Sequence, residues 1–107
     1  MREIVHAAVA RTIPAAAISD FSAAAPALRQ ILDAGADLLI TDCNMEGMDG
    51  PTLVRSLRQN GHLLPIIMVS GSTDAREMGE EAGIDRFISK DAVNSLLPAA
   101  IRSLIAM

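Results

Sequence analysis

The fold of this chain is indicated most strongly by the stretch Leu38-Leu39-Ile40-Thr41-Asp42-Cys43-Asn44-Met45-Glu46-Gly47-Met48-Asp49-Gly50. A short apolar run ends abruptly in the carboxylate of Asp42, a turn-rich segment follows, and a helical pattern then begins. In open α/β folds, ligand and catalytic sites lie at the carboxyl edge of the parallel sheet. A strand that delivers Asp42 to that edge offers it three possible roles: metal ligand, general base or nucleophile.

Length and composition restrict the class of protein. The 107 residues are enough for one domain, covering 1–107, and half of them are apolar. The net charge is −4 and no basic cluster exists, which argues against nucleic acid as a partner. The single Cys43 cannot form an internal disulfide, and neither a secretory signal nor a membrane-spanning run of about 18 apolar residues is visible. We therefore expect a cytoplasmic protein that does not bind membranes.

Apolar spacing predicts strands that alternate with helices. Strands are predicted at 13–19, 37–41, 65–70 and 85–89, and helices at 1–10, 21–34, 51–60, 75–82 and 94–106. This alternation predicts an α/β fold with right-handed crossovers and a mostly parallel sheet covered by helices on both faces. The strand at 13–19 is predicted from its short apolar run and its flanking turn residues, although alanine is a poor strand former.

Three predicted strands each end in a polar side chain: Asp42, Ser70 and Lys90. Because the carboxyl ends of parallel strands lie on one edge of a sheet, these residues are expected to meet there despite their separation in sequence. A carboxylate, a hydroxyl and an ammonium group suit phosphoryl transfer. The carboxylate attacks phosphorus, and the other two groups hold the oxygens that carry negative charge during transfer.

The same residues resemble those of a known family, the receiver domain of two-component response regulators. The resemblance covers roughly Ala24 to the C-terminus. It is carried by Asp42 with the Asn44-Met45 and Gly47-Met48-Asp49-Gly50 residues that follow, by Pro65-Ile66-Ile67-Met68-Val69-Ser70, by Ala82-Gly83 and by Phe87-Ile88-Ser89-Lys90. It implies a flavodoxin-like fold of three αβα layers.

The resemblance also implies a function. Asp42 would accept a phosphoryl group from a histidine kinase or a histidine phosphotransfer protein, with Ser70 and Lys90 holding it. Phe87 would be the aromatic switch residue, and the backbone carbonyl of Asn44 would be a ligand of Mg²⁺. The output is expected through contact with a downstream protein. Catalysis is expected to extend no further than self-catalysed phosphoryl transfer and dephosphorylation, so the chain is not expected to be an enzyme.

The N-terminal part departs from that family, which opens with an apolar strand and an acidic pair that holds magnesium. Met1 aligns near the family's first helix, so the central strand of the 2-1-3-4-5 order is missing, and 37–41 would expose its backbone along one edge. We favour a four-stranded sheet in which 13–19 pairs with 37–41 and brings Asp20 close to Asp42. The alternatives are a homodimer through that edge and a longer natural protein, and a simpler role for Asp20 is to cap the following helix.

Magnesium is the weak point of the expected site. The expected metal ligands are Asp42, Asn44 and Asp20, so Mg²⁺ should bind weakly and small phosphodonors should label the chain poorly or not at all. The alternative function is a degenerate pseudo-receiver, a phosphorylation-independent interaction or dimerisation module. A small aspartyl-phosphate hydrolase is disfavoured because Asn44 stands where such enzymes carry a second aspartate. A simpler role for Lys90 is a surface ion pair with Asp91 or Asp85.

Overall fold

A computed structural model describes residues 2–19, 21, 23–43, 49–72 and 74–105. The helices are α1 (Arg2–Thr12), α2 (Ala24–Ala34), α3 (Gly50–Gln59), α4 (Asp74–Ala82) and α5 (Val93–Ile105), with a short 3-10 helix η1 (Lys90–Ala92) before the last. The strands are β1 (Leu39–Asp42), β2 (Ile66–Ser70) and β3 (Arg86–Ser89). None of the described helices is long and apolar enough to cross a membrane.

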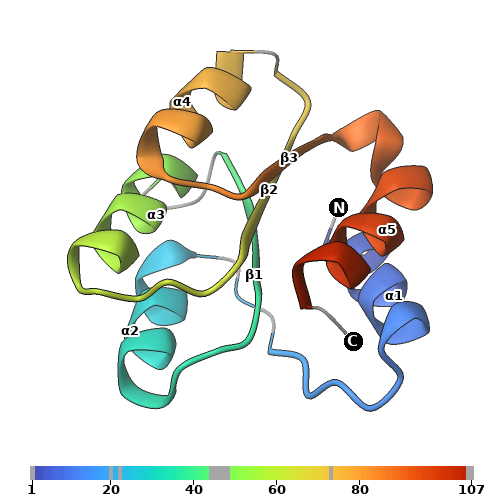
Figure 1. The fold of residues 1–107 in the computed structure, drawn as a ribbon, viewed down its shortest axis with the longest axis horizontal. Helices are drawn as coiled ribbons and strands as arrows, with labels where there is room; N and C mark the ends of the chain where they lie inside the picture. Colours follow the sequence, from blue (N-terminus) through green and yellow to red (C-terminus); the bar gives the residue numbers. More distant parts are fainter. Residues whose placement is uncertain (1, 20, 22, 44–48, 73, 106–107) are drawn as a thin grey trace.

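The three strands form one parallel sheet in the order β1-β2-β3. Helices α2, α3 and α4 cover one face of this sheet, and α1 and α5 cover the other (Figure 1). The predicted α/β class with three αβα layers is therefore confirmed.

The central strand β2 shows why the sheet is covered on both faces, since all five of its residues are buried. Successive side chains of a strand point to opposite faces. Ile66 and Met68 accordingly pack into the core beneath α2, α3 and α4, whereas Ile67 and Val69 pack into the core beneath α1 and α5. A strand enclosed by helices in this way needs a continuous apolar sequence, as 65–70 has.

The predicted strand at 13–19 was wrong. These residues form a turn and irregular chain, so the sheet has three strands in the described part of the protein instead of four. The physical reason lies in Pro14 and the three alanines after it, because alanine presents little side chain for a sheet to bury. Ile13 packs against the core beneath α5, and the Ser19 hydroxyl accepts a hydrogen bond from Gln30 (3.1 Å). Asp20 lies outside the described residues.

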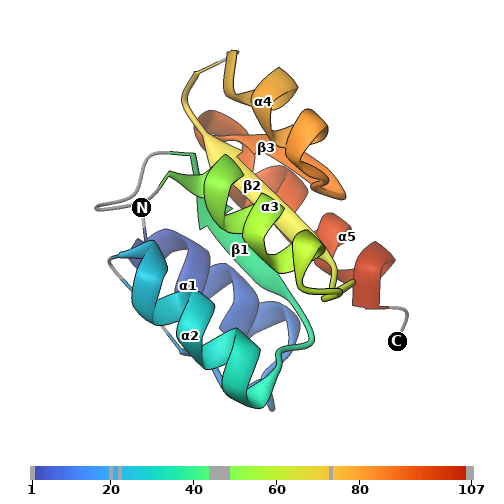
Figure 2. The same ribbon diagram turned by 90° about the vertical axis from the view of Figure 1, so that its left-hand side faces the viewer.

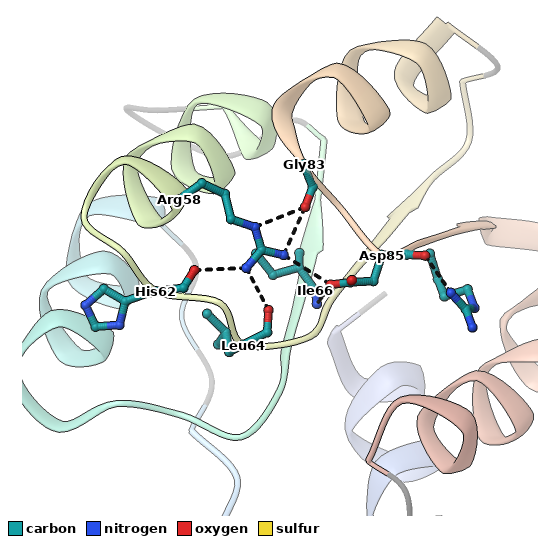
Figure 3. A network of polar contacts seen from close by, with 7 residues as sticks. Arg58, His62, Leu64, Ile66, Gly83 and Asp85 are labelled. Carbon is teal, nitrogen blue, oxygen red and sulfur yellow. Dashed lines mark hydrogen bonds and ion pairs between the residues drawn. The ribbon is translucent and has the colours of Figure 1, made fainter.

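A polar network ties the amino ends of β2 and β3 to the end of α3 (Figure 3). The Arg58 guanidinium donates to the backbone carbonyls of Gly83 (2.9 and 3.1 Å), His62 (2.9 Å) and Leu64 (2.9 Å). It also forms an ion pair with Asp85 (3.1 Å), whose carboxylate accepts from the Ile66 N–H (2.8 Å). Asp85 therefore pairs with Arg58 and not with Lys90.

Replacing Arg58 with alanine is expected to lower the free energy of unfolding by about 2 kcal/mol, because several carbonyls and one carboxylate lose a charged donor together. Lysine should not restore stability, since it lacks the planar fork of donors. The measurement is urea denaturation, with Arg55→Ala as the control because Arg55 is exposed on the same helix. Equal losses in the two alanine variants would contradict the prediction.

Candidate functional site

The carboxyl edge of the sheet holds the residues that the sequence singles out. β1 ends at Asp42, β2 at Ser70 and β3 at Ser89, directly before Lys90. Asp42 lies opposite Val69, and Ser70 lies opposite Ser89. The parallel register therefore places Asp42, Ser70 and Lys90 along one edge, as the sequence predicts.

Lys90 reaches across the end of β2 towards Asp42. Its ammonium nitrogen lies 3.9 Å from the Asp42 carboxylate, although Asp42 ends one outer strand, β1, and Lys90 follows the other, β3. A methyl group added to Gly71 would lie 3.6 Å from the Lys90 Cδ, so the lysine stem passes close to this glycine. The Lys90 side chain is 48% exposed and that of Asp42 is 25% exposed, so the pair contributes little to stability. Both groups are accessible to a reactant.

Ser70 lies between these two residues in the sheet but is much more buried. Only 3% of Ser70 is exposed, and its hydroxyl accepts a hydrogen bond from the Ser72 N–H at 3.2 Å. The hydroxyl oxygen is the acceptor in this bond, so the bond does not use the hydroxyl proton. Ser70 can therefore still donate a hydrogen bond at the edge where Asp42 and Lys90 meet.

The backbone beneath Asp42 is closely packed in a way that the sequence analysis missed. A Cβ on Gly50 would overlap the carbonyl oxygen of Asp42 and lie 3.1 Å from the Cα of Cys43. The Gly50 N–H also donates to the Cys43 carbonyl at 2.7 Å. The start of α3 is thereby held against the end of β1. The Asp49-Gly50 pair is the signal in the sequence that could have revealed this close approach.

The side chain of Asp49 caps α3 on the same side of the sheet. Its carboxylate accepts from the Thr52 N–H at 2.8 Å, and Pro51 occupies the first turn of the helix. Hydrogen bonding from the side chain and then the backbone N–H of Thr52 lowers the pKa of Asp49, and Arg55 has a smaller effect in the same direction. Charged Asp49 therefore stabilises the folded chain.

Replacing Asp49 with alanine is expected to cost about 1 kcal/mol at neutral pH. Because the pKa of Asp49 is lower in the folded than in the unfolded chain, its contribution is fully present above the unfolded value of about 4. The contribution is lost as the pH falls through the folded pKa. Urea denaturation should therefore show a smaller difference between wild type and Asp49→Ala in acid than at neutral pH. The prediction is contradicted if the stability difference between wild type and Asp49→Ala does not change with pH. It is also contradicted if Asp37→Ala, at an exposed aspartate, shows the same pH-dependent difference.

Cys43 follows Asp42 but faces the core, where it is 6% exposed. Burial raises the pKa of the Cys43 thiol, and the negative charges of Asp49 and Asp42 raise it further. The thiol is therefore held in its unreactive protonated form.

Phe87 lies on β3, half-buried against the core beneath α4. The guanidinium carbon of Arg76, from α4, lies 4.8 Å from the centre of the Phe87 ring. This cation–π contact joins the strand to the helix, and the sequence analysis did not anticipate it.

The described oxygen ligands at this edge meet only part of what a Mg²⁺ ion requires. Magnesium prefers oxygen ligands and is commonly held by one or two carboxylates, phosphate oxygens and several waters. Among the described residues, no group of three or more histidine, cysteine, aspartate or glutamate side chains is placed to hold a metal. Asp42 supplies one accessible carboxylate, which fits a hydrated, loosely held ion. Asn44 and Asp20, the other expected ligands, lie outside the described residues.

Comparison with known proteins identifies the family. A family model described as the response regulator receiver domain matches residues 1–102. The chain belongs to this family. Among curated proteins, this receiver domain is similar to the transcriptional regulatory protein PrrA of Mycobacterium tuberculosis, with 34% identity over 83 residues, which are 76% of this chain and 36% of PrrA. It is also similar to the sensor protein EvgS of Escherichia coli, with 36% identity over 70 residues, which are 64% of this chain and 6% of EvgS. The chain thus spans about a third of PrrA and a small part of EvgS.

Solved structures show the same fold. A putative response regulator from Chloroflexus aurantiacus has a TM-score of 0.82 and 27% identity, and the alignment covers 98% of this chain and 91% of that one. The receiver domain of a sensor histidine kinase from Pseudomonas aeruginosa has a TM-score of 0.86 and 20% identity, with 99% and 88% covered. That structure is described as having a magnesium ion coordinated in its active site cleft. These likenesses confirm the flavodoxin-like class.

Proposed function

We propose that this receiver domain is a phosphoacceptor that takes a phosphoryl group on Asp42 from a histidine kinase or a histidine phosphotransfer protein. The observation that carries the proposal is the Asp42–Lys90 pair, an accessible carboxylate 3.9 Å from an ammonium group at the carboxyl edge of the sheet. A carboxylate oxygen of Asp42 attacks phosphorus, the nitrogen–phosphorus bond of the phosphohistidine breaks, and an acyl phosphate forms on Asp42.

Lys90 and Ser70 stabilise the transferred group in this proposal. Phosphoryl transfer spreads negative charge over three oxygens, and the approach of a carboxylate adds more. The Lys90 ammonium neutralises part of that charge, and the Ser70 hydroxyl donates a hydrogen bond to one phosphoryl oxygen. Lys90 can move towards the product because its side chain is half exposed and crosses Gly71, which presents no side chain.

Magnesium would be held by Asp42, the Asn44 carbonyl and Asp20. When bound, the ion neutralises repulsion between the carboxylate and the incoming phosphoryl group. A site with one carboxylate among its described groups should hold the metal weakly. We therefore expect small phosphodonors such as phosphoramidate to label Asp42 poorly, and strong magnesium-dependent labelling by them would overturn this expectation.

Phe87 would act as the switch through which Asp42 influences a downstream protein. Phe87 lies on β3, and Lys90 follows the last residue of that strand directly. This position supports the role, because a movement of the Lys90 backbone would pull on β3 and so on Phe87. The signal would pass through protein contact at the surface formed by α4, β3 and α5.

The experiment that tests the proposal is phosphoryl transfer from purified, radiolabelled histidine kinases of the same genome. We expect label on the chain that hydroxylamine removes, as an acyl phosphate requires, and mass spectrometry should place it on Asp42. Asp42→Asn should accept none. Asp91→Asn is the matched control, because Asp91 is an exposed carboxylate one residue from Lys90, and it should accept label normally.

A second readout uses the fact that Lys90 is the only lysine of the chain. Selective ¹⁵N-lysine labelling gives one side-chain signal, which should shift when beryllium fluoride and Mg²⁺ mimic the acyl phosphate. No label from any kinase and no shift of the lysine signal would reject the phosphoacceptor and leave the alternative, an interaction module that works without phosphorylation.

A further inference from the structure

The Phe87 ring lies where α4 meets the sheet. Figure 1 and Figure 2 both show α4 beside β3. Phe87 lies opposite Met68 of β2 and packs with it into the core beneath α2, α3 and α4, and Ser70 lies two residues after Met68. Because side chains two residues apart in a strand share a face, Ser70 is on the same face of the sheet as Phe87. The ring and the serine of the candidate site therefore lie on the face that α4 covers.

Helix α4 packs closely against this face. A Cβ on Gly79 would lie 2.8 Å from the Ile84 Cδ1 and 2.9 Å from the Met68 sulfur, so the helix backbone approaches the core directly. Ala75, one turn earlier, is only 2% exposed. Arg76 follows Ala75 and is exposed, so it leaves the helix beside the buried side. The close packing of α4 thus gives the Arg76 side chain a fixed starting point next to β3.

The Arg76 guanidinium lies over the Phe87 ring, with 4.8 Å between its central carbon and the ring centre. The face of an aromatic ring carries partial negative charge and attracts a cation, and a planar guanidinium can also stack on it. Glu80 lies one turn further along α4, yet no ion pair forms between Arg76 and Glu80. The ring is half-buried, so the core and the guanidinium hold it together.

We propose that Arg76 is a positioning residue that holds Phe87 in the arrangement of the unmodified domain and so opposes the response to phosphorylation. The inference rests on the proposed function, in which Asp42 is the acceptor and Phe87 is the switch. The contact occurs in a chain whose Asp42 carboxylate pairs with Lys90. An interaction made in one arrangement favours that arrangement, and coupling between two sites is reciprocal. A contact that holds Phe87 in place therefore weakens the binding of a phosphoryl group at Asp42.

A purely electrostatic role for Arg76 predicts the opposite effect. A phosphoryl group is an anion, so the loss of a nearby cation weakens its binding if charge alone matters. In the proposed role, the loss of Arg76 releases the Phe87 ring and strengthens that binding. Cation–π contacts at exposed sites are weak, so the expected gain in affinity is about threefold. The direction of the change therefore separates the two roles.

The test titrates the chain with beryllium fluoride, a mimic of the phosphoryl group, at saturating Mg²⁺. The chain has two phenylalanines, so 4-fluorophenylalanine gives two fluorine NMR signals, and Phe21→Leu assigns them. The Phe87 signal reports both the ring and the affinity. Arg76→Gln should bind beryllium fluoride about threefold more tightly than the wild type, and Arg76→Lys should lie between the two. Unchanged or weaker binding to Arg76→Gln overturns the proposal.

Two controls show whether the effect passes through the ring. Arg86→Gln removes the same charge one residue before Phe87, but Arg86 bonds to Ser103 of α5 on the other face of the sheet, so the affinity should not change. In a Phe87→Leu background, Arg76→Gln should also leave the affinity unchanged, because the ring is gone. An equal gain in either control overturns the proposal.

A urea experiment separates failure of this inference from failure of the proposed function, because it uses no phosphoryl chemistry. Arg76→Gln should lower the urea midpoint of the wild type more than that of Phe87→Leu. Equal losses would show that Arg76 does not hold Phe87, and they would overturn the inference even if Asp42 accepts a phosphoryl group. If the urea losses differ but the wild type does not respond to beryllium fluoride, the proposed function fails and the regulatory role of Arg76 fails with it.

Discussion

Replacing Gly50 with alanine is expected to lower the free energy of unfolding by about 3 kcal/mol, among the largest effects of any single substitution in this chain. The new Cβ would overlap the backbone carbonyl of Asp42, and a backbone atom cannot rotate away as a side chain can. The start of α3 and the end of β1 would have to separate, which would also weaken the Gly50–Cys43 hydrogen bond. Urea denaturation at neutral pH measures the loss.

Gly71→Ala is the matched control for this substitution. The added methyl group would meet only the Lys90 stem at an ordinary contact distance of 3.6 Å, so stability should change by less than about 0.5 kcal/mol. Gly50→Ala should also reduce phosphoryl acceptance at temperatures where it remains folded, because the overlap displaces Asp42 itself. If Gly50→Ala unfolded at the same urea midpoint as the wild type, β1 and α3 would not approach as closely as described.

Replacing Lys90 with alanine is expected to slow phosphoryl transfer from a histidine kinase to Asp42 by about 100-fold, while stability changes by less than about 0.5 kcal/mol. The two effects separate because the Lys90 side chain is half exposed in the resting chain and its ammonium lies 3.9 Å from the Asp42 carboxylate, so water screens the pair. During transfer, the ammonium faces a phosphoryl group that carries more charge than the carboxylate alone. The measurement is the initial rate of radiolabel transfer, compared with the urea midpoint of the same variant.

Arg86→Ala and Lys90→Arg are the controls for Lys90. Arg86 is a cation at the opposite end of β3, bonded to Ser103 and to the Asp85 carbonyl, so its loss should leave transfer unchanged. Lys90→Arg keeps the charge and should recover part of the rate. Transfer to Lys90→Ala at the wild-type rate would remove Lys90 from the proposed chemistry, whether or not Asp42 is the acceptor.

Much of the candidate site could be predicted without coordinates, for a specific physical reason. Asp42 and Lys90 each follow a local apolar run, and in a parallel sheet the direction of the chain alone places all the carboxyl ends together. The positions of Asp42 and Lys90 therefore depend on patterns a few residues long. The closeness of Gly50 to Asp42 and the contact of Arg76 with Phe87 depend on how separate elements pack, and no local pattern records them.

The strand wrongly predicted at 13–19 shows that a local apolar pattern can be compatible with more than one structure. Its apolar residues are compatible with burial in a sheet, but the same residues also suit an irregular segment that lies between two helices. Ile13 contributes its side chain to the core beneath α5, and the alanines that follow have little to gain from pairing. The competition between these two outcomes is settled by contacts with distant parts of the chain.

The sequence by itself determined the alternation of strands and helices, the parallel sheet, and the arrival of an acid, a hydroxyl and an amine at one edge, because each depends on local periodicity and chain direction. The tertiary structure alone decided that residues 13–19 stay outside the three-stranded sheet of the described part of the chain, and that Lys90 pairs with Asp42 while Asp85 pairs with Arg58. These features depend on which surfaces pack together across the whole domain, and packing is a property of the folded chain.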